Sequence, residues 1–463
     1  MPRLLLISYR FPPESYPLAN SLAGVVRHLQ TEWDVDVVTA AEGAISTGSV
    51  RIHHVPGCAQ GRLSEVLRQL RLDKLDNLMT WPDPYRAWVD PALEKASSLV
   101  DRHQHDAAIV FMMPFSSGFV GTALKSRTGI PLVLNLDDSP TCSDMHPAYP
   151  SRWHYRQSIR LEDMFIRASD RVIYVSEHNR DRVAARHPAS FRERLRVIRC
   201  SADPPDVGPS AIPVSGAGTG RDASSDDVFR IVYTGAMTGW YALDPMPRSP
   251  SKRLYQAWNR IGQHRLTTLD RKTHSPVYIG QAIQRVLRRN PTWRGRVYLD
   301  VFGNTYPDDV TQRVLADYGV SDVVRLHGRI KPDAVRTETS SADLLFMSLP
   351  DRLDGSPGGR ISLKTYEYAL TDRPILAALP DGENRSFLTA VPGVHLTGPS
   401  DSTAMADVIE DLAHRTFDGE DLSVSRPKLR KQVSSEARAR AISDLLFEVA
   451  VVSDGDAAFS PAA

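Results

Sequence analysis

The amino-acid sequence predicts an α/β protein of two doubly wound domains, each built on a parallel sheet covered by helices. Three observations predict this class. The chain has 463 residues, more than one hydrophobic core usually serves. Short, nearly continuous apolar runs alternate with helical patterns, as expected for strands buried on both faces of a parallel sheet. A stretch rich in Pro, Ser, Gly and Asp, residues 203–227, divides this alternation into two series.

The first series covers the N-terminal part of the chain. Its apolar runs predict strands over residues 4–8, 35–39, 108–112, 131–136, 172–176 and 196–200. Helical patterns lie between them at residues 21–30, 91–102 and 156–168. We therefore predict an N-terminal domain over residues 1–205, followed by a linker over residues 206–228.

The second series begins directly after the linker. It predicts strands over residues 230–235, 297–303, 323–328, 343–348, 374–378 and 394–397, and helices over residues 278–289, 307–318 and 361–370. We predict a C-terminal domain over residues 229–430, in which the basic, aromatic segment 240–275 breaks the alternation as an insertion. A last helix over residues 431–450 and a disordered tail over residues 451–463 complete the prediction.

Composition narrows the function classes. The formal net charge is +1, which gives the whole protein no drive toward nucleic acid. The three cysteines are far apart and form no C-x-x-C pair, so neither a disulfide framework nor a structural zinc is expected. The first residues read as a strand rather than a signal peptide, and no apolar run approaches the ~20 residues that span a bilayer. These features predict a cytoplasmic protein.

The segment most suggestive of chemistry is a glycine-rich loop that enters a helix, residues 355–369. Ser362 is placed to begin the helix, whose free N–H groups and positive dipole end suit a diphosphate. Arg360 and Lys364 add positive charge, and Glu367, about one turn further on, could accept two ribose hydroxyls. The alternative is a surface helix with a glycine-rich entry loop.

Residues 362–377 also resemble the donor-site signature of glycosyltransferase family 4, the group 1 glycosyl transferases. Further segments match in the family's order, at residues 9–14, 81–88, 113–117, 170–176, 233–235 and 327–330. Two of them, 81–88 and 113–117, resemble the subgroup that makes envelope polysaccharides. The resemblance implies a GT-B fold, with two Rossmann-like domains facing across a cleft. It also implies an acceptor-binding N-terminal domain, a donor-binding C-terminal domain, retention of anomeric configuration, and no metal or other cofactor.

The resemblance assigns roles to the donor-side residues. Glu367 would bind the ribose, and Ser362 with Leu363 would offer backbone N–H groups to the diphosphate. Arg329 and Ile330 would lie beside the base, and Gly235 would leave room for the phosphates. Arg360 and Lys364 complete the donor set.

Two departures from the family pattern stand out. Gly359 occupies the position where many members carry the first of two glutamates. The family's Arg and Lys phosphate clamp falls in the 240–275 insertion, where Arg265, Arg271 and Lys272 are the candidates. A solvated basic loop is the alternative for these three.

The acceptor side is predicted in the N-terminal domain. Asp138 matches an acidic position of the family and could orient the acceptor hydroxyl, or it could cap a turn. Glu14, Tyr16 and Asn20 lie in or next to a loop where relatives carry glycines, and Ser116 lies in the 113–117 segment.

These features predict a retaining, metal-independent glycosyltransferase. It would move a sugar from a nucleotide diphosphate sugar to a glycan, a lipid-linked acceptor or a small molecule. Lys364, Arg271 and Lys272 would stabilise the departing diphosphate. The alternatives are a catalytically silent GT-B partner protein and a nucleotide-sugar epimerase. The segment 61–79, drawn as an amphipathic helix, could contact an anionic membrane surface or pack on its own domain.

Overall fold

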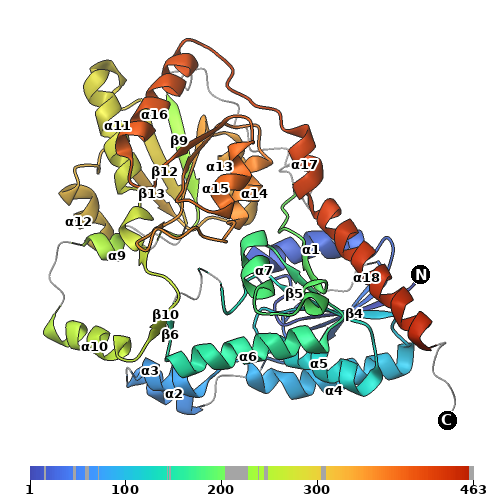
Figure 1. Ribbon diagram of the computed structural model, residues 1–463. Coiled ribbons are helices and arrows are strands. Elements are labelled where there is room, and N and C mark those ends of the chain that lie inside the picture. The colour runs from blue at the N-terminus through green and yellow to red at the C-terminus, as the bar shows by residue number, and fades with distance from the viewer. Residues whose placement is uncertain are drawn as a thin grey trace. The chain divides into compact units, whose positions relative to one another are not determined.

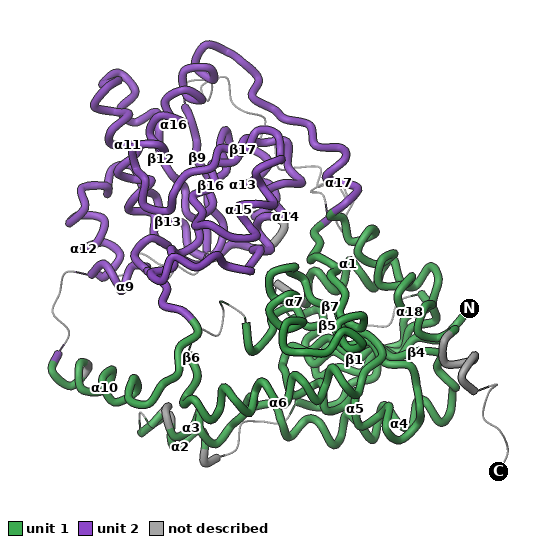
Figure 2. The backbone as a smooth tube through the Cα atoms, viewed as in Figure 1, with its two compact units in different colours: residues 1–202, 250–266, 433–463 green, residues 203–249, 267–432 purple. Residues whose placement is uncertain are grey.

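The structure is a computed structural model that describes residues 1–14, 17–44, 48–57, 62–70, 72–142, 144, 148–203, 228–237, 239–244, 249–303 and 309–457 (Figure 1). The chain divides into two compact units (Figure 2). Unit 1 comprises residues 1–202, 250–266 and 433–463, and unit 2 comprises residues 203–249 and 267–432.

Unit 1 is built on a seven-stranded parallel sheet. Its strand order is β3 (Val50–His54), β2 (Asp34–Thr39), β1 (Arg3–Ser8), β4 (Ala107–Phe111), β5 (Leu132–Leu136), β7 (Arg171–Tyr174) and β8 (Leu195–Val197). Six of these strands coincide with predicted runs. Only β3 was missed, because it is an edge strand of sequence VRIHH whose last four residues are at most half-buried. Such a strand lacks the continuous apolar run that a central strand shows.

Helices cover both faces of this sheet. One face packs on α4 (Val89–His103), α5 (Ser117–Thr128) and α6 (Arg152–Ala168). The other packs on α1 (Pro17–Leu29) and α18 (Ser435–Ala457), which lie side by side (Figure 1). The last helix therefore completes the core of unit 1, and it continues beyond residue 450, to Ala457, where a disordered tail was predicted. Residues 458–463 lie outside the described part.

The smaller elements of unit 1 connect these layers. They are α2 (Arg62–Gln69), α3 (Asp73–Met79), η1 (Arg86–Trp88), β6 (Ala148–Tyr149), α7 (Glu177–Ala184) and α8 (Ala189–Arg192). The single helix predicted over residues 61–79 is thus two short helices, α2 and α3.

Unit 2 is built on a six-stranded parallel sheet. Its order is β13 (Val324–Gly328), β12 (Val297–Phe302), β9 (Phe229–Thr234), β14 (Leu344–Ser348), β16 (Ile375–Ala378) and β17 (Val394–Thr397). All six coincide with predicted strands. The helices α11 (Val277–Arg289) and α16 (Ser402–Phe417) pack on one face, and α14 (Leu363–Ala369) and α15 (Glu383–Thr389) pack on the other.

The remaining elements of unit 2 are short. They are α9 (Trp240–Leu243), β11 (Leu269–Asp270), η2 (Arg271–Thr273), η3 (Pro291–Trp293), α12 (Asp309–Asp317), α13 (Pro332–Ser340) and β15 (Asp351–Arg352). The helix α17 (Pro427–Val433) ends where the chain returns to unit 1.

The segment predicted as an insertion in the C-terminal domain is divided between the units. Residues 250–266, with α10 (Pro250–Arg260) and β10 (His264–Arg265), belong to unit 1. There β10 pairs antiparallel with β6, and the ring of His264 lies 4.5 Å from that of Tyr155. Residues 267–275 belong to unit 2, where β11 pairs with β15. The assignment of the whole segment to the second domain differs from the structure because non-local pairing leaves no signal in the local sequence.

Among the described residues, none of the helices combines the length and the apolar character that a bilayer span requires.

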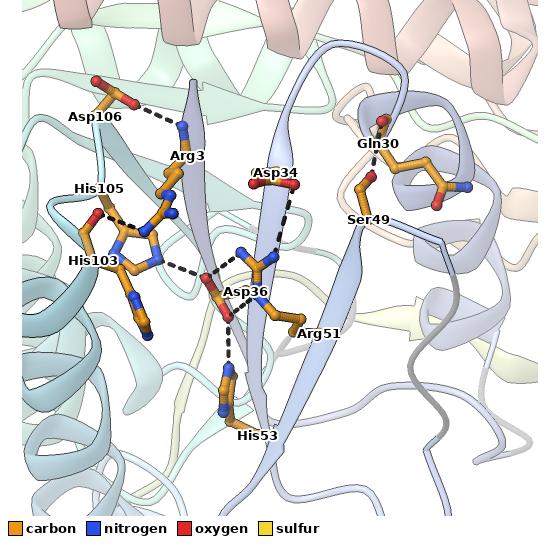
Figure 3. A network of polar contacts seen from close by, with 10 residues as sticks. All are labelled: Arg3, Gln30, Asp34, Asp36, Ser49, Arg51, His53, His103, His105 and Asp106. Carbon is orange, nitrogen blue, oxygen red and sulfur yellow. Dashed lines mark hydrogen bonds and ion pairs between the residues drawn. The ribbon is translucent and has the colours of Figure 1, made fainter. Parts of the chain in front are cut away.

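A polar network around Asp36 joins β2, β3 and the segment just before β4 in unit 1 (Figure 3). The carboxylate of Asp36 on β2 accepts hydrogen bonds from Arg51 Nε at 3.0 Å and Nη2 at 2.8 Å. The Nε2 atoms of His53 and His105 lie 2.6 and 3.0 Å from the same carboxylate. Burial raises the pKa of Asp36, but the hydrogen bonds from the two histidines and Arg51 outweigh burial and hold it well below its usual range.

Removing this acceptor should destabilise unit 1 strongly. We expect Asp36→Ala to lower the free energy of unfolding by about 2–4 kcal/mol, because the buried His105, together with His53 and Arg51, would lose the carboxylate that they share. The network's contribution is complete above the unfolded carboxyl pKa of about 4 and is lost as the pH falls below it. Urea unfolding at several pH values measures both effects.

Asp34 supplies the matched control for this experiment. Its carboxylate lies 3.8 Å from Arg51 and is 31% exposed. Asp34→Ala should therefore cost less than about 1 kcal/mol. Equal losses of unfolding free energy in the two variants would show that the network around Asp36 stabilises unit 1 no more than a surface ion pair does.

Candidate functional site

Three strands of unit 2 end at glycines that lie close to one another, so no side chain covers the backbone there. Gly235 follows β9, has a φ of +117°, and donates its N–H to Phe302 O at 2.7 Å. Gly303 follows β12 and donates to Gly328 O at 2.7 Å, and a Cβ added to Gly303 would overlap the carbonyl oxygen of Gly235. The backbone is therefore bare at the carboxyl ends of parallel strands, where ligands of such sheets bind.

Lys364 reaches this bare backbone from α14. Its Nζ lies 3.8 Å from the centroid of the Tyr233 ring and would lie 3.0 Å from a Cβ at Gly235. Surrounding protein lowers the pKa of Lys364 to about 7, Glu367 opposes this shift, and Arg360 adds to it. Gly235, Arg360 and Lys364, which were all predicted at the donor site, therefore belong to one cluster at the end of β9.

His274 belongs to the same cluster, although the sequence did not single it out. Its Nε2 lies 3.3 Å from the hydroxyl of Tyr233, which also donates to Ala236 O at 3.2 Å. Burial, with the positive charges of Lys364 and Arg360, lowers the pKa of His274 to about 3. The imidazole is therefore neutral at neutral pH. The positive charge of the cluster comes from Lys364 and Arg360 instead.

The predicted Gly-rich loop and helix are present as a fixed structure. Ser362 stands immediately before α14 with extended backbone, φ −68° and ψ 141°, but its hydroxyl makes no capping hydrogen bond. Gly358 donates its N–H to Asp381 O at 3.2 Å and accepts from Glu383 N at 2.8 Å. Thr365 Oγ1 donates to Asn384 Oδ1 at 2.8 Å, which ties α14 to α15. Thr365 also donates its backbone N–H to Ser362 O at 2.9 Å, which closes the first turn of α14 on Ser362.

Glu367 lies on α14, one turn beyond Lys364. The protein around Glu367 raises its pKa, whereas Lys364 lowers it. The side chain is nevertheless exposed to solvent. The carboxyl group of Glu367 is therefore accessible to a ligand from solvent.

The other donor-side predictions have different surroundings. Arg329 is exposed just after Gly328, whereas Ile330 packs on the core cluster beside α14 and α15. Arg271 and Lys272 are exposed on η2, and Lys272 N donates to Asp270 Oδ1 at 3.1 Å. Arg265 lies on β10 and so belongs to unit 1. The three candidate clamp residues are thus divided between the two units.

Unit 1 contains a cavity of about 680 Å³ at the predicted acceptor side. It is lined by aromatic, carboxylate, amide and guanidinium groups: Arg10, Asn77, Trp81, Asp83, Tyr85, Phe115, Asp138, Tyr149, Tyr255, Asn259 and Gln263, among others. Asp138, which is predicted to face the acceptor, is one of the residues that line this cavity. The adjacent Asp137 instead accepts a hydrogen bond from Arg438 Nη2 of α18 at 2.9 Å.

Ser116 does not offer its hydroxyl to the cavity. It is buried, and its N–H and Oγ donate to the two oxygens of Asp83 at 2.7 and 2.8 Å. Burial raises the pKa of Asp83, and these hydrogen bonds oppose the rise. Ser116 therefore orients Asp83, which lines the cavity, and the acceptor-side role of Ser116 stays a prediction. Asp83 stands in the 81–88 segment, so its signal was present in the sequence.

The other three residues predicted on the acceptor side differ in their positions. Glu14 forms an ion pair with Arg10, whose Nη2 also donates to the hydroxyl of Tyr85 at 3.2 Å. Glu14 thus acts on the cavity through Arg10. Asn20 is exposed on α1, and Tyr16 lies outside the described residues.

No group of three or more His, Cys, Asp or Glu side chains in the described part of the chain is arranged to hold a metal ion.

Comparison with known proteins agrees with this architecture. Residues 18–201 match the family model of the glycosyl transferase 4-like domain. No curated protein matches the chain.

Solved structures match it over nearly its full length. HepE from Anabaena, in complex with UDP and glucose, is 14% identical with a TM-score of 0.56, over 96% of this chain and 99% of that one. A trehalose 6-phosphate synthase from Burkholderia multivorans is 15% identical with a TM-score of 0.59, over the whole of both chains. The sucrose-phosphate synthase of Thermosynechococcus elongatus is 14% identical with a TM-score of 0.57, over 98% and 100%. The chain therefore has the GT-B fold.

Proposed function

We propose that this protein is a glycosyltransferase that transfers a sugar from a nucleotide diphosphate sugar to an acceptor hydroxyl. The observation that carries the proposal is the position of Lys364 in unit 2, against the bare strand end at Gly235, which Gly303 in turn approaches closely. A glycosyl transferase 4-like domain and a GT-B fold shared with HepE, which binds UDP and UDP-glucose, support the same conclusion.

The chemical demand of this reaction is the departure of the diphosphate. Negative charge grows on its oxygens as the sugar–oxygen bond breaks, and positioned cations stabilise that charge in a site that is already organised. Lys364 and Arg360 supply positive charge at the strand ends, and the N–H groups at the start of α14 add hydrogen-bond donors. We propose that these groups stabilise the leaving diphosphate without a metal ion. Arg271 and Lys272 on η2 remain candidates to join them.

Glu367 and unit 1 complete the proposal. The exposed Glu367 carboxylate is one turn from Lys364 and is placed to accept the ribose hydroxyls. The cavity of unit 1 would receive the acceptor, with Asp138 orienting its hydroxyl. Aromatic walls with carboxylate and amide groups suit a sugar or another polyhydroxylated acceptor. The resemblance to retaining enzymes favours attack from the face that the diphosphate leaves, and it favours polysaccharide assembly in the cytoplasm.

The deciding experiment is nucleotide binding to wild type and to Glu367→Ala. Calorimetry and thermal shift against UDP, GDP, TDP and ADP without metal should show one preferred nucleotide. The variant should bind it at least about 10- to 100-fold more weakly, because a single hydrogen bond to a charged group is worth about 1.5–3 kcal/mol. Glu420→Ala, which removes an exposed carboxylate paired with Arg415, is the control and should change nothing.

Other outcomes would point elsewhere. Unchanged affinity in Glu367→Ala would remove Glu367 from the donor site. No binding of any nucleotide would favour a catalytically silent partner protein. Release of a free epimerised sugar would favour an epimerase.

A further inference from the structure

The helix α10 has two different faces. Tyr255 and Asn259 line the cavity of unit 1. Leu254, Trp258 and Ile261, spaced four and three residues apart, are 73%, 46% and 59% exposed. At this spacing the three apolar side chains share one side of the helix. A helix whose inner face closes a cavity thus presents an apolar stripe to solvent.

The neighbouring elements extend this apolar surface. Asn77 and Thr80, at the end of α3, line the same cavity as α10. Figure 2 shows α2, α3, α10 and β6 gathered at one end of unit 1. These elements and the first turn of α6 carry further large exposed apolar side chains. We define the rim surface as Val66, Leu70, Leu75, Met79, Trp153, Leu254, Trp258 and Ile261.

The charge on α10 and on the residues that follow it has one sign. Residues 250–266 contain four basic residues and no acidic residue. Arg253 and Arg260 on α10 are exposed, as are Arg152 and Arg156 in the first turns of α6. An apolar stripe flanked by arginines is typical of a helix that lies in the interface of an anionic bilayer. The arginine stems also cover apolar surface while their charged ends reach lipid phosphates.

We propose that the rim surface docks unit 1 on an anionic lipid bilayer. The apolar side chains would enter the boundary between headgroups and acyl chains, and the arginines would contact lipid phosphates. One consequence rests on the proposed function: an acceptor anchored in the same bilayer would present its polar end to the cavity beside α10. The docking itself needs neither nucleotide nor turnover.

Vesicle co-sedimentation of the full-length protein, without nucleotide, tests the proposal. Wild type should bind vesicles of phosphatidylglycerol and phosphatidylcholine at least about tenfold more tightly than vesicles of phosphatidylcholine alone, and added salt should weaken this binding. The triple variant Leu254→Ser, Trp258→Ser, Ile261→Ser should bind about tenfold or more weakly. The double variant Arg253→Glu, Arg260→Glu should lose the preference for the anionic lipid.

Matched changes elsewhere separate docking from general surface effects. Val451→Ser removes an exposed apolar side chain from α18, and Arg285→Glu with Arg288→Glu reverses two exposed charges on α11. Both controls should bind vesicles like wild type. Equal binding by wild type and the triple variant, or no preference for anionic lipid, would overturn the proposal. A dimeric wild type and a monomeric triple variant would also overturn it, because a second copy of the chain would then cover the rim surface.

Nucleotide affinity distinguishes the two proposals. The rim variants should bind the preferred nucleotide like wild type, because their changes lie in unit 1 and the donor residues lie in unit 2. Failed docking with intact nucleotide binding refutes only the docking. Intact docking without nucleotide binding refutes only the proposed function.

Discussion

Lys364→Ala is expected to lower the rate of sugar transfer by about 10²- to 10³-fold, the usual cost of removing one preorganised group that stabilises transition-state charge. The reason is its position, with Nζ 3.8 Å from the Tyr233 ring centroid, against the bare backbone at Gly235. The binding experiments identify the preferred nucleotide. The rate is then measured as release of the nucleoside diphosphate from the corresponding sugar nucleotide.

Lys428→Ala is the matched control, because Lys428 is an exposed lysine of unit 2 on α17. It should transfer sugar at the wild-type rate. A Lys364→Ala enzyme whose KM rises while kcat stays unchanged would mean that Lys364 binds the donor without acting on the transition state.

The same lysine should make nucleotide binding depend on pH. With a pKa of about 7, Lys364 is largely neutral at pH 8 in the free protein. A bound diphosphate favours the charged form, so binding at pH 8 should take up a proton, whereas binding at pH 6 should not. Calorimetry in buffers of different ionisation enthalpy measures this uptake. Lys364→Met should abolish it.

Gly303→Ala is expected to unfold the donor edge of unit 2. The added methyl would overlap the carbonyl oxygen of Gly235, and backbone cannot rotate away as a flexible side chain can. We expect a loss of about 3 kcal/mol in the free energy of unfolding, at the upper end of overpacking costs. Nucleotide affinity should fall at least about tenfold, because the strand ends at Gly235 and Gly303 move apart. Urea unfolding and calorimetry measure the two effects.

Gly398→Ala is the control for this change. A Cβ at Gly398 would meet only the Cβ of Asp401, at 3.7 Å, which is ordinary van der Waals contact. Its stability and nucleotide affinity should match those of wild type. A Gly303→Ala protein as stable as this control would show that the close approach at the strand ends is not required.

The strands were predictable because burial on both faces of a parallel sheet leaves a local signal. Every strand of the unit 2 sheet lies where an apolar run predicted it, and so does every strand of the unit 1 sheet except β3. The edge strand β3 and the two-residue strands β6, β10, β11 and β15 escaped prediction. Their residues are short, partly polar runs that become strands only by pairing with a distant partner.

The donor side was readable in the same local way. A glycine-rich loop, a helix start and charged residues at helical spacing are adjacent in sequence, so Arg360, Ser362, Lys364 and Glu367 could be named together. Asp138 was named because it matches an acidic position of the family that it resembles, just after a predicted strand. Ser116 was named from its segment, and only the structure shows that its N–H and its hydroxyl both donate to Asp83.

The sequence by itself thus determined the two α/β series, because strands and helices depend on neighbouring residues. Tertiary structure alone decided three other features. It brought His274 to Tyr233 and Lys364, it lowered the pKa of that lysine to about 7, and it seated α10 on the cavity of unit 1. Each of these features arises from contacts between residues that are far apart along the chain. The spacing of residues in the sequence does not predict such contacts.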